Sequence, residues 1–356
     1  MLDFTITING QNLEGWKAAE VKRSLDALSG SFSLDFTDAW NRTGQIWSIK
    51  PQDEIVISLG SNVVLTGYVD RISASIAAES RNIRAVGRDR TSDLIDSSVV
   101  GQYEYEEITF NNLAVTLAKQ AGIKVISKKK SSKKLKVGIS PGDSIYNVLL
   151  AEARKEGLLM NTDGLGNLVI DEIGRTQISS ALREGINVKS AQMNLDFTSR
   201  FNEYLVLAQS QANDNLSGEQ ASQIQGRATD TNVRNSRGLV VVADKNADER
   251  QAVEIARYEA NSRAANSETV SVTIPTWNTT DSNGSPNENE IWPLNRLVYL
   301  DAPSINVRKS LLIASTTFSI TPQGQNCTLG LRRPDSFTPA PTIEKEDSTA
   351  SFLEGL

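Results

Sequence analysis

The sequence predicts a multidomain α+β protein, with two small antiparallel β-barrel-like domains and inserted α/β modules. Three observations support this fold class. The chain has 356 residues, enough for two or three domains. Apolar and polar residues alternate along short segments near both ends, whereas helical spacing is confined to the middle. Hydrophobic residues make up 39% and charged residues 22%, as in an ordinary globular protein.

The first β-rich region, placed at residues 1–103, contains several strand signals separated by short turns. Its first two segments alternate the apolar residues Phe4, Ile6, Ile8, Phe32, Leu34 and Phe36 with polar ones. Tight turns are expected at Asn9-Gly10 and at residues 60–62, and residues 81–90 supply a further strand. Such short connections favour antiparallel pairing in a small barrel or sandwich.

An α+β insert is predicted at residues 104–175, where the hydrophobic period changes. Residues 111–122 and 141–157 carry apolar residues at helical spacing, and each segment has glycine at or near its end. Asp143 is expected to cap the second helix. Residues 158–171 then predict a hairpin around an Asp-Gly turn.

A bridging α/β region is predicted at residues 176–268. Residues 200–211 indicate a strand, residues 212–230 a long polar loop, and residues 238–244 a buried type of strand, because three valines follow one another. The clearest helix of the chain is expected at 246–267.

The helix at 246–267 carries a narrow stripe of small apolar residues that allows close approach to a sheet. This stripe consists of Ala252, Val253, Ala256, Ala260 and Ala264. Glu259 precedes Arg263 by four residues, which predicts an ion pair on the helix surface.

A second β-barrel-like domain is predicted at residues 269–334. Val270, Val272 and Ile274 alternate with polar residues, and a meander around a turn at Gly324 follows. Residues 335–356 are rich in Pro, Ser, Thr and acidic residues, which predicts a flexible tail.

The charge distribution argues against binding of nucleic acid. The net charge is -6, although residues 127–136 contain six lysines and no acid. We expect this lysine run to be a solvated loop, because it lacks the interleaved aromatic residues that stack on bases. DNA contact is therefore not expected.

Compartment and membrane signals are few. No apolar run approaches the roughly 18 residues of a membrane span, and the N-terminus lacks the features of a signal peptide. The single cysteine, Cys327, excludes an internal disulfide and suits a reducing compartment. No membrane insertion by the chain itself is expected.

The absence of histidine weakens the case for an enzyme. It removes the commonest general base and metal ligand, and one cysteine cannot complete a zinc site. We therefore expect no enzymatic activity, no catalytic residues, no cofactor-binding residues and no metal ligands.

Two clusters of carboxylate residues are candidates for the acid and base of a glycosidase. One comprises Glu104, Glu106 and Glu107, and the other comprises Asp171 and Glu172. Because 43 acidic residues produce such clusters by chance, exposed structural carboxylates are the preferred interpretation.

Three further motifs favour structural roles. The glycines of residues 164–168 fall in a predicted hairpin turn rather than between a strand and a helix, so they do not indicate a nucleotide site. Residues 230–238 lack the ligand spacing of a calcium loop. Residues 141–157 resemble the start of a peptidoglycan-binding LysM module only over about a dozen residues, and a plain capped helix is favoured.

The segment GRDRTSDLIDSS, residues 87–98, combines arginines, aspartates and hydroxyls but is explained as a strand-to-helix junction. Thr91 or Ser92 is expected to cap a short helix that carries Asp93 in its first turn. Arg88 and Arg90 are expected to form ion pairs with neighbouring strands or with another subunit.

This segment also resembles the baseplate hub (tail) proteins of Mu-like contractile phages and prophages. The likeness continues at residues 232–244, 256–274, 292–303 and 311–337. Related hub modules occur in T-even phages and in type VI secretion spike proteins. The lysine-rich insert carries no such likeness.

The resemblance implies a virion structural protein of a contractile injection system. Three copies would form a ring that joins the sixfold tail tube to the threefold spike. The implied partners are two further copies, the tail spike protein and the tail tube or baseplate proteins. The implied place is the virion tail baseplate, with viral assembly in the bacterial host cytoplasm. The residues of the subunit interface are unknown from sequence.

Three functions compete at this point. A structural hub protein is favoured by the missing histidines, the two β-rich regions and the resemblance. A cell-wall (peptidoglycan) binding module depends on the LysM-like turn, and a carboxylate-only glycosidase depends on the acidic clusters. We rank them in that order.

Overall fold

The computed structural model describes residues 3–37, 49–77, 80–209, 224–243 and 247–338. Residues 1–194 with 268–334 form one compact unit, unit 1. Residues 195–267 form the body of a second, unit 2, to which residues 335–338 are also assigned. Within the described ranges no helix has the length and apolarity needed to cross a membrane.

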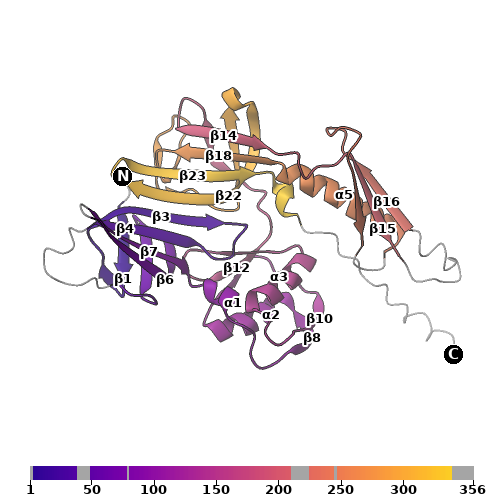
Figure 1. Ribbon diagram of the computed structural model, residues 1–356, viewed down its shortest axis with the longest axis horizontal. Helices are drawn as coiled ribbons and strands as arrows, with labels where there is room; N and C mark the ends of the chain where they lie inside the picture. The colour runs from indigo at the N-terminus through magenta and orange to yellow at the C-terminus, as the bar shows by residue number, and fades with distance from the viewer. Residues whose placement is uncertain (1–2, 38–48, 78–79, 210–223, 244–246, 339–356) are drawn as a thin grey trace. The chain divides into compact units, whose positions relative to one another are not determined.

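Unit 1 is built on one large sheet of thirteen strands (Figure 1). The strands are β1 Phe4–Ile8, β2 Gln11–Asn12, β3 Trp16–Ser24, β4 Ser31–Thr37, β5 Glu54–Leu59, β6 Asn62–Ala77, β7 Ser80–Asp89, β13 Gln177–Arg183, β14 Ser190–Leu195, β18 Glu268–Ile274, β21 Leu297–Ala302, β22 Val307–Thr321 and β23 Gly324–Arg332. Their order is β14-β18-β23-β22-β3-β4-β7-β6-β5-β1-β2, with β13 pairing β21 and β21 pairing β22.

The antiparallel pairing of β3 with β22 joins the two β-rich ends of the chain into a single sheet. The strands predicted by alternation are present, and the hairpin of β22 and β23 around Gly324 is confirmed. The order among the described strands does not close into a ring, so the barrel-like closure is not confirmed. The alternation pattern specifies which face of a strand is buried, but it does not specify whether the sheet closes on itself.

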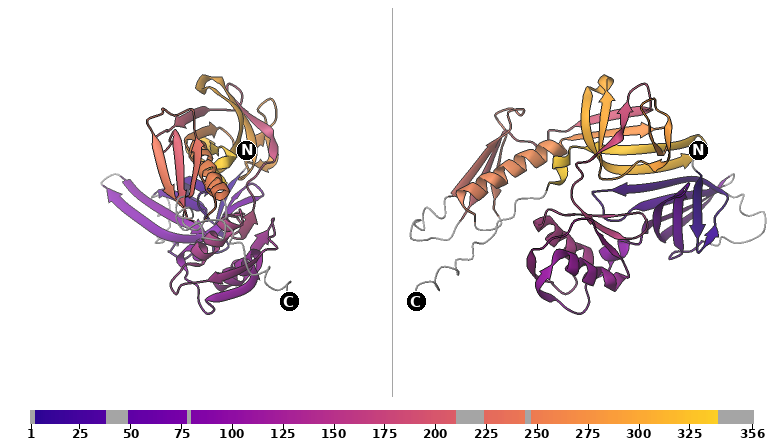
Figure 2. Two further views of the ribbon diagram at one scale, coloured as in Figure 1. Left: turned by 90° about the vertical axis from the view of Figure 1, so that its right-hand side faces the viewer. Right: turned by 180° about the vertical axis from the view of Figure 1, so that it is seen from behind.

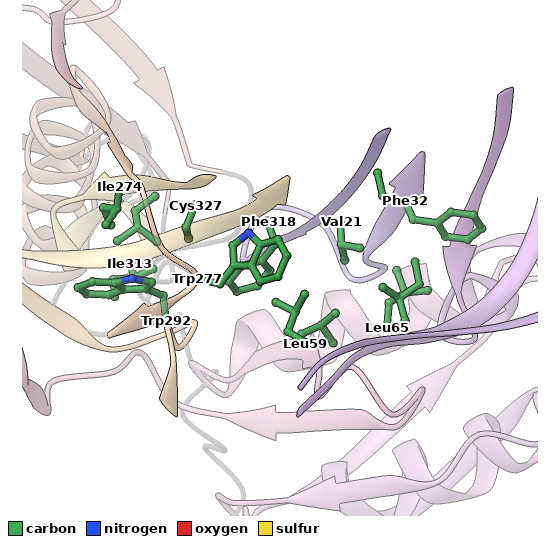
Figure 3. Packing of buried hydrophobic residues seen from close by; sticks show 14 of the residues in the cluster. Val21, Phe32, Leu59, Leu65, Ile274, Trp277, Trp292, Ile313, Phe318 and Cys327 are labelled. Carbon is green, nitrogen blue, oxygen red and sulfur yellow. The ribbon is translucent and has the colours of Figure 1, made fainter. Parts of the chain in front are cut away.

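A continuous hydrophobic core follows this sheet from the N-terminal to the C-terminal strands (Figure 3). Trp277 and Trp292 are fully buried in it beside Phe318 and Cys327. The indole nitrogen of Trp277 donates to the carbonyl oxygens of Ser319 at 3.2 Å and Asn326 at 3.1 Å. Burial of a polar indole is inexpensive when its N–H is paired in this way.

The remaining strands of unit 1 between β18 and β21 form a small antiparallel pair, β19 Asn278–Thr280 with β20 Pro286–Ile291.

Strand β3, which connects the two ends of the sheet, is not predicted by the sequence pattern, because alanine, lysine and glutamate dilute its apolar alternation.

An α+β module lies within unit 1 between β7 and β13 (Figure 1). Its elements are α1 Ser92–Asp96, β8 Glu104–Thr109, α2 Phe110–Ala118, β9 Val125–Ser127, β10 Lys134–Gly138, α3 Ile145–Lys155, β11 Leu159–Thr162 and β12 Leu168–Asp171. Both predicted helices are confirmed, and so is the predicted hairpin, now β11 and β12.

Two local predictions in this module were wrong. Ser144, not Asp143, caps α3 by accepting from the backbone N–H of Asn147 at 3.2 Å, because Asp143 lies one residue too early and accepts from Ser140 instead. The lysine run is not entirely a loop either. Its last three residues belong to β10, where alternating Leu135 and Val137 are buried.

Unit 2 contains the three-stranded sheet β16-β15-β17 with helix α5 along one face (Figure 2). The elements are β15 Glu203–Ala208, β16 Ile224–Thr229, β17 Gly238–Val242 and α5 Glu249–Asn266. Asp248 and Gln251 form a capping box at the start of α5. The predicted helix is confirmed, and its ion pair joins Arg263 Nε to Glu259 Oε2 at 2.8 Å.

The buried face of α5 differs slightly from the predicted stripe. Ala252, Ala256 and Ala260 are buried as expected, but Val253 is only partly buried and Ala265 replaces Ala264 as the next buried position. With 3.6 residues per turn, neighbouring residues lie 100° apart around the helix, so burial at the last turn comes from a different side than along the alanine stripe.

Two further predictions in unit 2 need correction. Residues 224–229 of the predicted polar loop form strand β16, and residues 210–223 lie outside the described residues. Strand β17 is not of the buried type, because its residues alternate between partly buried and exposed. Among the described residues, only one face of this edge strand is covered. A run of apolar residues does not reveal this, because the cover depends on tertiary packing. Residues 339–356 of the predicted flexible tail also lie outside the described residues.

Candidate functional site

Three of the five carboxylates that are catalytic candidates, Glu106, Asp171 and Glu172, lie in ion pairs with lysines. Lys136 Nζ is 2.6 Å from Glu106 Oε1, and the hydrogen bond from this lysine lowers the pKa of the Glu106 carboxyl. Lys128 pairs with Asp171 and Lys129 with Glu172, at 3.5 Å and 2.8 Å. The lowered pKa of Glu106 opposes the function of a general acid, so this carboxylate gives no support to glycosidase chemistry.

The glycine-containing turn of residues 164–168 is a packing element. Gly164 and Gly166 connect β11 to β12, and each has a φ of +83°. The Asp163 carboxylate accepts from the backbone N–H groups of Leu165 at 2.8 Å and Asn167 at 3.1 Å. Its hydrogen bonds are thus satisfied within the turn.

The most extensive polar arrangement of unit 1 surrounds Asp89, the last residue of β7. Asp89 is 1% exposed and accepts from Gly30 N at 2.7 Å, Thr91 N at 2.8 Å and Ser29 Oγ at 3.2 Å. The Thr91 hydroxyl also donates to it. Burial raises the pKa of Asp89, against the opposing effect of these hydrogen bonds and one from Thr162.

The Asp89 carboxylate therefore gathers three separate segments: the β3–β4 turn, the start of α1 and the end of β11. This explains a departure from the predicted cap. Thr91 occupies the N-cap position of α1 but makes no side-chain cap bond, because its hydroxyl is used by Asp89. Asp93 does lie in the first turn of α1, as predicted.

The two arginines on either side of Asp89 extend outward to neighbouring elements. Arg88 Nε lies 2.8 Å from Asp70 on β6 and its Nη2 lies 2.6 Å from Asp96 on α1. The hydrogen bonds that Arg88 donates to Asp96 and Asp70 raise the pKa of Arg88. Arg90 pairs with Glu54 on β5. The predicted ion pairs with neighbouring strands are confirmed.

A buried arginine lies on the inner side of this junction. Arg23 on β3 is 9% exposed and its Nε atom has no hydrogen-bond partner among the described residues. Burial lowers its pKa, whereas the charges of Asp89, Cys327 and Asp163 raise it. Arg23 also faces the Phe318 ring, 6.0 Å from its centroid.

The hairpin turn of the module packs closely on the large sheet. A Cβ at Gly164 would lie 2.7 Å from the carbonyl oxygen of Val64 on β6 and 3.3 Å from Arg23 Nη1. A Cβ at Gly166 would lie 2.9 Å from the side chain of Arg90. Such distances leave no space for a side chain.

The module is also attached where the chain leaves it. Asn295 accepts from Gly174 N at 2.8 Å and donates to the carbonyl oxygen of Glu172 at 2.8 Å. The module is thus held to the sheet at its entry, at its hairpin turn and at its exit. This arrangement, the junction around Asp89, fixes the position of the module on the sheet.

Sequence reasoning found the outer residues of this junction but missed its inner ones. Arg88, Arg90 and Thr91 were singled out, whereas Arg23 and Asn295 were not. The contacts of the missed residues join positions far apart in the chain, 121 residues apart for Gly174 and Asn295. The sequence does contain one signal for Arg23. The alternation of its strand neighbours places this position on the buried face, where an arginine is rare and needs a partner.

Three family models match successive parts of the chain. The first describes the N-terminal part of the GpP-like baseplate assembly protein of Mu phage and matches residues 3–89. The second describes the second domain of the gp44-like baseplate hub protein and matches residues 91–172. The third describes the fourth domain of the Mu phage protein GpP and matches residues 246–340. The first two models meet at the junction around Asp89.

Individual proteins match over most of their length. The chain is 27% identical to the baseplate hub protein gp44 of Escherichia phage Mu over 329 residues, which cover 90% of this chain and 84% of that protein. The crystal structure of the 43 kDa tail protein of prophage MuSo2 from Shewanella oneidensis superposes with a TM-score of 0.82, at 26% identity, over 95% of this chain and 99% of that one.

A more distant structure shares the fold. The E. coli c3393 protein, a type VI secretion component described as similar to the T4 tail proteins gp27 and gp5, superposes with a TM-score of 0.52 at 11% identity. The match covers 95% of this chain and 79% of that one.

Proposed function

We propose a role in tail architecture from one premise: the chain belongs to the family of baseplate hub proteins of Mu-like phages and prophages. It is a phage tail baseplate hub protein, related in fold to contractile injection systems. In the finer proposal, three copies form a ring that joins the sixfold tail tube to the threefold spike.

The observation that carries this proposal is the ordered match of hub-domain models along the chain, together with the match to the phage Mu hub protein over 90% of it. The fold is consistent with it, because two β-rich ends that pair through β3 and β22 form one stiff sheet. In a trimer, two β-rich regions per copy supply six comparable surfaces to a sixfold tube.

The proposed partners are two further copies of the chain, the spike protein and the tube or neighbouring baseplate proteins. The proposed role is mechanical rather than enzymatic, and the junction around Asp89 supports it by holding the α+β module to the sheet at three places. Assembly in the bacterial host cytoplasm follows from this role.

Sedimentation equilibrium of the full chain tests the trimer. We expect a mass of about three times 38.8 kDa at micromolar concentration. A single species of 38.8 kDa up to the highest soluble concentration would contradict the ring of three copies. The same sample incubated with peptidoglycan provides a check on the competing cell-wall function, for which we expect no co-sedimentation.

A further inference from the structure

Two asparagines of the sequence are followed directly by glycine, in the pairs Asn9-Gly10 and Asn283-Gly284. Both pairs lie in turns of unit 1, the first between β1 and β2 and the second between β19 and β20, and both asparagines are exposed. An asparagine before glycine is especially open to deamidation, because glycine has no Cβ to hinder attack by its own backbone nitrogen on the asparagine side chain. The hydrogen bonds around each pair therefore decide how readily the reaction occurs in the folded chain.

The chemistry of deamidation sets two structural requirements. The nitrogen of the following residue attacks Cγ of the asparagine, a C–N bond forms, and the side-chain nitrogen leaves as ammonia together with the proton of the attacking nitrogen. Water then opens the five-membered succinimide ring. Cleavage at Cγ gives aspartate, and cleavage at the main-chain carbonyl carbon gives isoaspartate. The asparagine side chain must thus be free to turn toward the following nitrogen, and the N–H of that nitrogen must be released from any hydrogen bond.

The Asn9 side chain is held through both atoms of its amide. Its Nδ2 donates to Asp53 Oδ1 at 3.0 Å, and its Oδ1 accepts from Glu54 N at 3.1 Å. The Asn9 backbone N–H also donates to the Glu54 carbonyl oxygen at 3.0 Å, which keeps the turn against the start of β5. The two side-chain bonds must break before Cγ can approach the nitrogen of Gly10, so the folded structure protects this pair.

The Asn283 side chain makes no hydrogen bond to any residue in the described part of the chain. The turn holds the backbone instead, because Asp281 Oδ1 accepts from Asn283 N and from Ser285 N, both at 2.8 Å. Gly284 N donates to the Asp281 carbonyl oxygen at 3.2 Å, the long end of the usual range. A single weak bond therefore restrains the attacking nitrogen, and the side chain that it attacks is free to turn.

The turn between β19 and β20 is also packed against another segment of unit 1. A Cβ at Gly284 would lie 2.9 Å from Cγ2 of Ile186 and 3.3 Å from the Ile186 carbonyl oxygen. Arg183 Nη1 donates to the Ser282 carbonyl oxygen at 3.1 Å. An isoaspartyl residue lengthens the main chain by one carbon atom and adds a negative charge, so the turn cannot keep both contacts in their present geometry.

We propose that Asn283 is a site of spontaneous deamidation in the folded chain, and that its isoaspartyl product loosens the β19–β20 hairpin from residues 183–186. Asn9 has the same following residue but is protected by its bonds to Asp53 and Glu54. The proposal does not depend on the ring of three copies.

Incubation of the full chain at mildly alkaline pH, followed by mass spectrometry of the two peptides, compares both sites in one sample. In the native chain we expect Asn283 to deamidate at least about tenfold faster than Asn9, because only Asn9 must first be released by local opening. In concentrated urea the two rates should become similar, since only the local Asn-Gly sequence then remains. Methylation by an isoaspartyl methyltransferase distinguishes isoaspartate from aspartate among the products.

Asp53→Ala provides a matched test of the protection at Asn9. It removes the acceptor of Asn9 Nδ2, so it should accelerate deamidation at Asn9 and leave the rate at Asn283 unchanged. An unchanged rate at Asn9 would show that these bonds do not protect it.

Hydrogen exchange of the aged chain tests the loosening. Amides of β19 and β20 should exchange at least about tenfold faster in the aged wild-type chain than in the fresh one. Asn283→Gln keeps the amide but does not form the five-membered ring readily, so this variant should age without the change.

Each result supports or overturns a stated part of the proposal. A native chain in which Asn283 deamidates no faster than Asn9 overturns the site, and so does a difference in rate that persists unchanged in urea, because the fold is then not its cause. Unchanged exchange of β19 and β20 in a chain that is deamidated at Asn283 overturns the loosening. Faster exchange on ageing of Asn283→Gln overturns it equally, since another reaction is then responsible.

Discussion

The junction around Asp89 contrasts with the open face of unit 2, the face of its sheet that α5 does not cover and that carries Leu205, Leu207, Val240 and Val242. At the junction, a buried carboxylate satisfies donors from three segments of the same chain, and neighbouring glycines permit close packing. Among the described residues, no layer covers these aliphatic side chains, whereas α5 packs on the other face of the same sheet. The first region is held together by contacts within one chain, whereas the second leaves aliphatic side chains exposed among the described residues.

The largest effect should come from removing the carboxylate at the centre of the junction. Asp89→Ala leaves buried donors of Gly30, Thr91 and Ser29 without an acceptor, and should lower the free energy of unfolding of unit 1 by about 3–5 kcal/mol. Tryptophan fluorescence during urea unfolding measures this specifically, because all five tryptophans fall within the residues of unit 1.

Asp35→Asn is the matched control for this substitution. Asp35 is 44% exposed and its carboxylate lies 3.8 Å from Arg84 Nε. We expect a change of less than about 0.5 kcal/mol, as for most exposed ion pairs. Equal effects at Asp89 and Asp35 would show that the junction is not a central support of unit 1.

A pair of glycine substitutions separates close packing from backbone strain. Gly164 and Gly185 have φ of +83° and +78°, so alanine is strained at both. Only at Gly164 would the new Cβ meet another segment, 2.7 Å from the Val64 carbonyl oxygen. Gly185→Ala should cost about 1 kcal/mol and Gly164→Ala about 2–3 kcal/mol more. Urea unfolding followed by tryptophan fluorescence gives both values, and similar costs would mean that the module can move away from the sheet.

The contrast between these regions also shows which structural features the sequence predicts and which it does not. Alternation identified the strands around Phe32 and Val272, and helical spacing identified α3 and α5, because these patterns are local. The contacts of Asp89 with Gly30 span 59 residues, and local patterns carry no record of them. The open face was missed for a similar reason. Three successive valines suit a strand that is covered on both faces, and only the tertiary structure shows that the described residues cover one face of β17 alone.

A smaller effect is expected at the rim of the junction. Arg88 is about one-third exposed and joins Asp70 to Asp96, so Arg88→Ala should cost unit 1 about 1 kcal/mol after solvent screening. Arg88→Lys should recover little of this, because a single ammonium cannot reproduce the two-sided contact of the guanidinium. The control is Arg84→Ala, for which no measurable loss is expected. If Arg88→Lys has the wild-type free energy of unfolding in urea, then the positive charge alone stabilises the rim of the junction.

The smallest effect on the folded monomer is expected at the open face, and that is informative. Val242→Thr changes an exposed position, so below the trimer dissociation constant it should alter the stability of unit 2 by less than about 0.5 kcal/mol. Val206→Thr places the same hydroxyl on the covered face of the same sheet, where Val206 is fully buried, and should cost about 1–3 kcal/mol. Native-state hydrogen exchange of the α5 amides measures both, since α5 packs on that covered face. If the two substitutions cost the same in dilute solution, the open face is already covered within a single chain. If only Val206→Thr is costly, the covered face of this sheet stabilises the monomer and the open face contributes little to that stability.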